Sequence, residues 1–206
     1  MLTIWGRRNS INVQKVLWTA ELCGRSYESI EVGGPFGGTD TPQYLAMNPT
    51  KLVPTLQDGD VAVWESNTIV RYLAAKYGSD GLYPVNPARR SLAERWMDWQ
   101  LSTLNKPMRD LFWGYVRLPP EKHDPARMEK ALALAAEAMA LLDAHLATHR
   151  FVAGDHFTMG DIPVGCFSWR WFQLPLARPV LPHLQRWHEA LHDIPGYRRH
   201  VMVTMT

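Results

Sequence analysis

The sequence predicts a fold in two parts, an α/β part followed by an all-helical part. In residues 1–78, short alternating segments typical of strands occur between segments in which apolar residues have helical spacing. Residues 79–87 are rich in glycine and proline, the composition of a domain boundary. Beyond this linker the apolar residues follow a helical period and no strand pattern recurs. We therefore predict two domains, residues 1–78 and residues 86–206.

The first domain is expected to have the element order βαβαββα. Apolar residues at the i, i+3, i+4 and i+7 positions of one helix face begin at Val13, and Gly24 stands where such a helix would stop. Asp58-Gly59 is a strong signal for a β-hairpin between two strands. The remaining expected elements are strands over residues 2–6 and 27–33, a short helical turn over residues 42–50, and a helix over residues 66–78.

The second domain is expected to contain only helices and loops. Its first helix is long and should be bent or interrupted near Pro107, because proline removes a helical hydrogen bond. Thr158 and Asp161 have the spacing of a capping box, a structural motif that opens a helix. The expected helices lie within residues 88–116, 124–149, 158–172 and 181–194.

Composition and charge exclude several functional classes. The chain of 206 residues is 46% apolar and 20% charged, as in a soluble globular protein. Its formal charge is only +2, so we expect no nucleic-acid partner. No apolar run reaches the roughly 18 residues of a membrane span, and no signal-peptide layout is present, so we expect no membrane partner. Cys23 and Cys166 lie far apart in no CxxC motif, which fits a reducing cytoplasm. Histidine pairs at i, i+4 lack metal-site context, so no metal is expected.

A proline within a strand pattern is the first candidate binding feature. Proline cannot donate to a strand ladder, so Pro54 is expected at a sheet edge or in a cis turn. A cis Val53-Pro54 bond would expose the amide and carbonyl of Val53 to an extended peptide that adds to the sheet edge. The alternative is a proline that only shapes a turn.

An acid-serine pair is the second candidate binding feature. Ser66 is expected to be the N-cap of its helix, and helix N-termini bind carboxylates. Glu65 adds an acceptor for an ammonium group. Together the two residues suit the α-end of an amino acid, although helix caps alone are common.

Two segments, NPTKLVPTLQDGDVAVWESNTIVRYLAAKY and FVAGDHFTMGDIPVGC, are the most specific parts of a resemblance that covers the whole chain. The chain resembles the cytosolic glutathione S-transferases. The resemblance implies a thioredoxin-like first domain, a homodimer, and glutathione as co-substrate with no metal or other cofactor. It also implies that the backbone of Val53, before a cis Pro54, holds the cysteine of glutathione, and that Glu65 and Ser66 hold its γ-glutamyl end.

The same resemblance places the glutathione thiol at the start of the first helix, beside residues 8–12. Members of the family use tyrosine, serine or cysteine there, but no tyrosine lies in residues 1–26 and no cysteine precedes Cys23. Ser10 and Asn12 fit the pattern of bacterial members similar to disulfide-bond reductases, as hydrogen-bond donors that lower the pKa of the thiol. The alternative is that Ser10 only caps the helix that begins at Ile11.

Further contacts with glutathione and with a second substrate are expected from the resemblance. Lys51 stands one place before the usual position of the residue that binds the glycine carboxylate, where this chain has Leu52. The expected reaction is conjugation of the glutathione thiolate to a small hydrophobic electrophile. Alternatives are glutathione-dependent reduction of a disulfide or peroxide, and a non-catalytic interaction module. The candidate residues for the second substrate are Arg8, Trp113, Tyr115 and Arg117, although an aromatic stripe is more often core.

Overall fold

A computed structural model describes residues 1–206, which divide into two compact units. The first unit comprises Met1–Tyr83 and Pro195–Thr204, and the second comprises Pro84–Ile194 with Met205–Thr206. The change of unit near residue 84 falls within the linker region expected from the sequence. The segment Pro195–Thr204, however, belongs with the sheet and not with the helical unit in which the sequence placed it.

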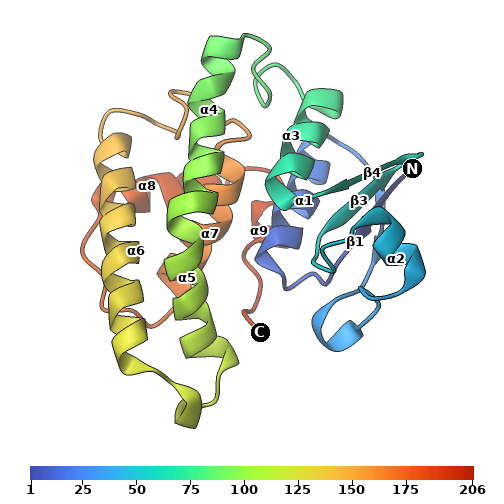
Figure 1. The fold of residues 1–206 in the computed structure, drawn as a ribbon. Coiled ribbons are helices and arrows are strands. Elements are labelled where there is room, and N and C mark those ends of the chain that lie inside the picture. The colour runs from blue at the N-terminus through green and yellow to red at the C-terminus, as the bar shows by residue number, and fades with distance from the viewer. The chain divides into compact units, whose positions relative to one another are not determined.

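The first unit has the predicted order βαβαββα, with a 3-10 turn after the second strand (Figure 1). A short helix near the C-terminus, α9, completes it. The elements are β1 (Leu2–Trp5), α1 (Ile11–Leu22), β2 (Tyr27–Ile30), η1 (Gly34–Phe36), α2 (Pro42–Met47), β3 (Thr55–Asp58), β4 (Val61–Trp64), α3 (Ser66–Tyr77) and α9 (Tyr197–His200).

The four strands form one mixed sheet in the order β2-β1-β3-β4. Strand β1 runs parallel to β2 and antiparallel to β3, and β3 pairs with β4 through the predicted hairpin at Asp58-Gly59. Gly59 has a φ of +61°, a left-handed conformation that glycine adopts without steric cost. Two strands of the sheet, β2 and β4, are therefore edges.

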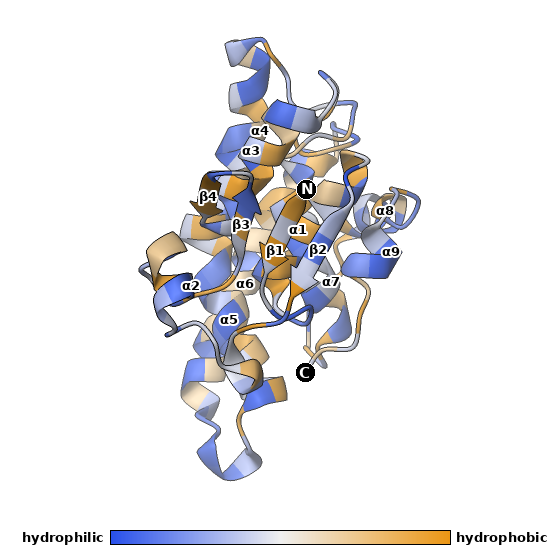
Figure 2. Cartoon of the chain, turned by 90° about the vertical axis from the view of Figure 1, so that its right-hand side faces the viewer, coloured by the Kyte–Doolittle hydropathy of each residue, from blue (hydrophilic) through white to orange (hydrophobic).

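Side chains of β1 alternate between the two faces of the sheet and build a core on each. Ile4 packs with Val13 and Leu73, in the cluster shared with helices α1 and α3. Trp5 points to the other face, where its ring lies 6.2 Å from that of Tyr44 in α2. Figure 2 shows the apolar colouring of β1 beside α1.

Helix α1 also explains why the chain's end belongs to the first unit. The Trp18 ring lies 4.9 Å from that of Tyr197 in an edge-to-face contact, and its Nε1 donates to the carbonyl of Pro195 at 2.9 Å. Glu21 pairs with Arg199 at 3.2 Å and with His200 at 2.7 Å. None of these contacts has a local sequence pattern, so a domain boundary predicted from composition alone did not assign this segment to the first unit.

The second unit is helical, as predicted. A π-helical segment, η2 (Gln100–Leu104), lies between its first two helices and confirms the expected interruption near Pro107. In a regular α-helix a proline ring would clash with the carbonyl four residues earlier, which for Pro107 is that of Thr103, and Thr103 lies within the π-helical segment η2. A second π-helical segment, η3 (Trp113–Arg117), follows the second helix. The helices are α4 (Pro87–Trp99), α5 (Asn105–Phe112), α6 (Pro125–Leu146), α7 (Asp161–Gln173) and α8 (Pro182–Leu191).

Asp161 begins α7 and is fully buried, in the structural role that the sequence predicts. Its carboxylate accepts hydrogen bonds from the Thr158 amide at 2.9 Å and from the Val152 amide at 3.0 Å. Trp187 of α8 donates a third at 3.0 Å. Burial raises the pKa of Asp161 to about 6 even though these donors oppose the rise. The carboxylate therefore joins a loop, a helix start and a second helix.

No helix in the structure is both long enough and apolar enough to cross a membrane.

Candidate active site

The joint between β1 and α1 presents a serine whose side chain the helix does not use. Ser10 occupies the predicted N-cap position, with an extended backbone, and it is 8% exposed. Its hydroxyl makes no capping hydrogen bond to α1. The first N–H groups of a helix have no partners within the helix, so this end of α1 offers both a hydroxyl and backbone donors to a ligand.

Gly6 holds this joint against the loop that contains Val53. A Cβ atom at Gly6 would lie 2.5 Å from Cγ2 of Val13 and 3.2 Å from Cβ of Val53, so no larger residue fits. The φ of Gly6, +150°, is also one that side chains disfavour. Sequence reasoning missed this role, although a glycine that directly follows a strand is a signal for a close backbone approach.

The Val53-Pro54 peptide bond is cis, as predicted. Pro54 is buried and Val53 is half-buried. The amide and carbonyl of Val53 form no hydrogen bond within the chain, since Val53 lies just outside β3. They are therefore available to a peptide that lies along this edge, which is the arrangement that the sequence predicts.

A buried polar cluster fixes the peptide group before Val53. Tyr44 and Asn48 both donate to the carbonyl of Leu52, the latter at 2.9 Å. Thr55 closes the cluster, because its hydroxyl donates to Tyr44 and accepts from Asn48, each at 2.9 Å. Sequence reasoning expected only a short helical turn over residues 42–50 and missed the cluster. A tyrosine among the apolar residues of a short helix was the available signal.

Glu65 and Ser66 stand at the start of α3, but the cap differs from the prediction. Glu65 is the N-cap and Ser66 is the first helical residue, so the predicted cap at Ser66 is wrong by one position. Glu65 has a φ of +68°, an unfavourable conformation for a glutamate that is typical of functional sites. Its side chain is exposed, while Ser66 is buried.

A lysine that sequence reasoning missed connects the two candidate regions. The Nζ of Lys15 lies 3.4 Å from Oγ of Ser66 and 3.2 Å from Oδ1 of Asn67. The Ser66 hydroxyl in turn donates to Oδ1 of Asn12 at 3.3 Å. Asn12, predicted beside the thiol, therefore contacts Ser66, predicted at the γ-glutamyl end. Only the packing of α1 against α3 brings these residues together.

Lys51 lies in the turn that leads to the Val53 loop. Its φ of +60° follows a turn in which the Thr50 hydroxyl donates to Asn48 at 2.7 Å. The Lys51 side chain is exposed and has no hydrogen-bond or ion-pair partner in the chain. Its expected contact with a carboxylate stays a prediction.

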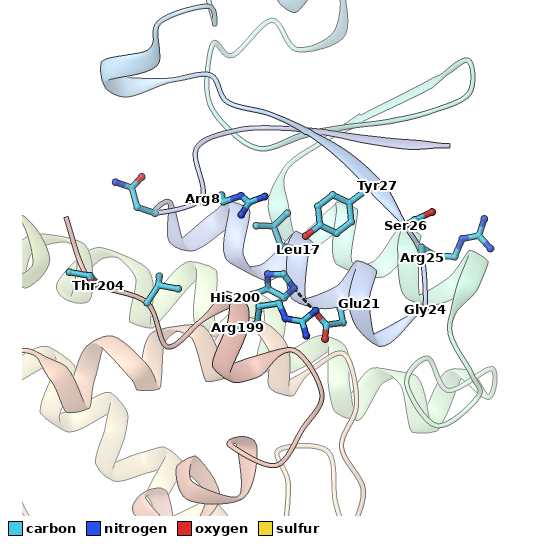
Figure 3. Close-up of a pocket in the computed structure, with 12 residues that line it drawn as sticks. Arg8, Leu17, Glu21, Gly24, Arg25, Ser26, Tyr27, Arg199, His200 and Thr204 are labelled. Atoms are coloured by element: carbon cyan, nitrogen blue, oxygen red, sulfur yellow. Dashed lines mark hydrogen bonds and ion pairs between the residues drawn. The ribbon is translucent and has the colours of Figure 1, made fainter.

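Two of the four residues predicted for a second substrate, Arg8 and Trp113, line different cavities. Trp113, 51% exposed, lines a cavity of about 140 Å³ in the second unit, whereas Tyr115 and Arg117 do not line it. Arg8 lines a cavity of about 710 Å³ in the first unit, where Figure 3 shows it near Tyr27. Each cavity lies within one unit, and a shared pocket stays a prediction.

The cysteines and histidines are placed as structural groups. Cys23 is half-buried, its Sγ lies 3.6 Å from the carbonyl of Leu73, and burial raises the pKa of its thiol to about 11. Cys166 is buried. The His145 and His149 rings stack at 4.1 Å, and no group of three or more histidine, cysteine or acidic residues forms a metal site.

Comparisons with known proteins match both units of the chain. Residues 1–75 match the family model "Glutathione S-transferase, N-terminal domain", and residues 125–190 match "Glutathione S-transferase, C-terminal domain". Glutathione S-transferase GstB of Escherichia coli K12 is 44% identical, with both chains covered in full. Glutathione S-transferase 3 of Zea mays is 30% identical over 97% of this chain and 93% of the relative.

A solved structure shows the same likeness. It is the theta class glutathione S-transferase from Xanthomonas axonopodis pv. citri with glutathione bound. Its sequence is 55% identical, the match covers 100% of this chain and 99% of that one, and the TM-score is 0.96. The chain therefore belongs to the glutathione S-transferase family, as the motifs of its sequence predict, and glutathione transfer is the activity of that family.

Proposed function

We propose that this chain binds glutathione in its first unit and conjugates the glutathione thiolate to a small hydrophobic electrophile. The contact between Asn12 and Ser66 is the observation that carries the proposal. It joins the start of α1, where a thiol would lie, to the start of α3, where an amino-acid end would bind. A relative that is 55% identical was solved with glutathione bound, which supports glutathione as the ligand of this chain.

Each part of glutathione has a complementary group. The Val53 amide and carbonyl pair with the backbone of its cysteine, and the polar cluster around the Leu52 carbonyl keeps that peptide in place. The backbone N–H groups at the start of α3, that of Ser66 among them, receive the γ-glutamyl carboxylate, and Glu65 accepts from the γ-glutamyl ammonium. Lys51 receives the glycine carboxylate.

The reaction needs a thiolate at neutral pH. The helix dipole of α1 and the donors of Ser10 and Asn12 stabilise the negative sulfur and so lower the pKa of the thiol. The sulfur then forms a bond to an electrophilic carbon. In a substitution, the bond from that carbon to the leaving group breaks and its electron pair leaves with the group. In an addition, the π electrons of a conjugated acceptor take up the negative charge. Glutathione is the co-substrate, and the residues of this site assign no role to a metal or a further cofactor.

Reduction of a disulfide or peroxide by bound glutathione is the alternative within the same site. Cys23 is the C-cap of α1 and Ser10 is its N-cap, so the cysteine lies at the opposite end of the helix from the thiol site. A mixed disulfide between glutathione and the protein is therefore not expected. Both reactions begin from the thiolate that Ser10 and Asn12 stabilise.

We further propose a cytoplasmic homodimer. The first unit exposes apolar side chains at Leu52, Val61 and Trp64, the last two on the edge strand β4. Exposed apolar residues on a sheet edge are typical of surfaces that another chain covers. A second copy of this chain is the partner that the family resemblance implies.

Thiolate titration in variants tests the proposal. Ser10→Ala and Asn12→Ala are each expected to raise the pKa of the bound glutathione thiol by roughly one unit, because each removes one donor to a charged sulfur. The ultraviolet absorbance of the thiolate, measured against pH, reports this value. Ser91→Ala, an exposed serine of α4, is the matched control.

Three results would contradict parts of the proposal. An unchanged thiol pKa in both variants would leave Ser10 as a helix cap only. No retention on glutathione resin and no thermal stabilisation by glutathione would favour the non-catalytic interaction module. Turnover of disulfides or peroxides without conjugation of any electrophile would favour the reductase.

A further inference from the structure

Lys15 is a charged side chain in the interior of the first unit. It is 1% exposed and lies on α1 three residues after Asn12, so the two share a helix face. Lysine is almost never fully buried unless polar groups receive its hydrogen bonds. Here these groups include Ser66 and Asn67, in the first turn of α3.

The hydrogen bonds of this cluster have a direction. A lysine ammonium only donates, so Oγ of Ser66 must accept from Lys15. The Ser66 hydroxyl then donates its hydrogen bond to Oδ1 of Asn12. Because its oxygen is used in this way, Asn12 keeps its amide N–H groups for another acceptor, and they have no partner in the chain. A thiolate needs donors of this kind.

We propose that Lys15 is a positioning residue that couples the γ-glutamyl site to the thiolate site, an inference that rests on the proposed function. Through Ser66 it turns the Asn12 amide so that N–H, and not C=O, faces the sulfur. It also places a positive charge beneath the start of α3, where it adds to the helix dipole that attracts a carboxylate. One buried side chain thus supports both ends of the ligand.

Replacement of Lys15 by methionine tests the coupling, because methionine is unbranched, apolar and adaptable in a core. In Lys15→Met we expect the KM for glutathione to rise about tenfold, since a positive charge near the carboxylate is lost. The thiol pKa should rise by about as much as in Asn12→Ala, because the amide loses its orientation. Circular dichroism and thermal unfolding verify that the variant is folded.

A double-mutant cycle separates positioning from a structural role. If Lys15 acts through Asn12, adding Lys15→Met to Asn12→Ala should leave the thiol pKa of Asn12→Ala unchanged, while the KM still rises. Thiol pKa shifts that add fully in the double variant would overturn the coupling. So would a folded Lys15→Met protein with the wild-type thiol pKa.

Two further variants keep the inference testable if Lys15→Met does not fold. Ser66→Ala breaks the chain between Lys15 and Asn12 and should raise the thiol pKa, so an unchanged value would overturn the coupling. Lys15→Arg keeps a hydrogen-bond donor at this position, so its thiol pKa should lie nearer to that of the wild type than the thiol pKa of Ser66→Ala does. If the wild-type protein does not bind glutathione as a thiolate, the proposed function itself is overturned. If the wild type binds the thiolate and the variants have the same thiol pKa, only the coupling is overturned.

Discussion

Ser10 shows how a residue can follow a structural rule and leave its side chain for chemistry. A serine at an N-cap usually accepts a hydrogen bond from the helix, and this bond contributes about 1 kcal/mol. In this chain the Ser10 hydroxyl makes no such bond, and its backbone alone begins α1. Asn12 differs, because Ser66 already engages its oxygen and leaves only its amide N–H groups for a ligand. The two residues therefore offer donors of different kinds to one sulfur.

His188 provides a pH-dependent prediction at the residue scale. It is buried, its Nδ1 lies 2.9 Å from Oγ of Ser168, and burial together with nearby His192 lowers its pKa to about 3. The unfolded chain, with an ordinary pKa near 6.5, binds a proton that the folded chain does not bind at pH values between the two. The free energy of unfolding therefore falls as the pH drops below about 6.5, by up to about 1.4 kcal/mol per pH unit from this residue.

Comparison with His188→Gln isolates this contribution. Between about pH 6.5 and pH 5, the wild type should lose about 2 kcal/mol of unfolding free energy more than the variant, in denaturant titrations at each pH. Asp161 titrates in both proteins, so its contribution to the pH dependence of the unfolding free energy cancels when the variant is subtracted from the wild type. Parallel pH dependences in the two proteins would show that His188 is not held neutral.

At the scale of elements, helix starts and helix interruptions organise this fold. Pro107 is a local signal that the structure confirms. The capping box at Thr158 and Asp161 is confirmed only in part, because the Asp161 carboxylate accepts from the Thr158 amide, whereas the N-cap of α7 is Gly160 and the Thr158 hydroxyl accepts from the Gly160 amide. The start of α3 at Ser66 is as predicted, but its N-cap was predicted one residue late, because serine is a common cap and a glutamate with positive φ is rare. That conformation depends on packing around the site and not on local preference.

Asp161 provides the prediction at this scale. Asp161→Ala removes the acceptor of four buried donors, and each orphaned donor costs about 1–3 kcal/mol. We therefore expect the free energy of unfolding to fall by at least about 3 kcal/mol, with a smaller loss for Asp161→Asn, which keeps one oxygen. Urea titration measures the change.

Asp155→Ala is the matched control for this prediction, since Asp155 is an exposed acid in the loop before α7. It should change stability by no more than about 0.5 kcal/mol. Equal losses in Asp155→Ala and Asp161→Ala would mean that the buried carboxylate does not join the loop to α8.

At the scale of the whole molecule, the edge strand β4 is the feature that a second copy would cover. Exposed apolar side chains on an edge strand favour association, and a lysine on that edge opposes it. The double variant Val61→Lys, Trp64→Lys should therefore shift the proposed dimer toward monomer, by at least tenfold in the dissociation constant. Light scattering coupled to size-exclusion chromatography measures the mass at several protein concentrations.

Val180→Lys is the control for association, because Val180 is an exposed apolar residue of the second unit. It should leave the mass unchanged. A wild type that is monomeric at all concentrations, or a double variant that stays dimeric at all of them, would contradict the predicted surface.

The family resemblance implied the cis bond before Pro54, which the structure confirms. The sequence by itself determined the element order and the hairpin at Asp58-Gly59, and it marked Pro54 and the pair Glu65-Ser66 as candidate binding features. These features depend on hydrophobic period and on the backbone preferences of neighbouring residues, which a local pattern reports. Only the tertiary structure decided that Lys15 meets Ser66, 51 positions away, and that the segment Pro195–Thr204 packs on α1. A buried hydrogen bond between distant residues has no periodic signal, because its partners are chosen by the packing of two helices and not by their spacing along the chain.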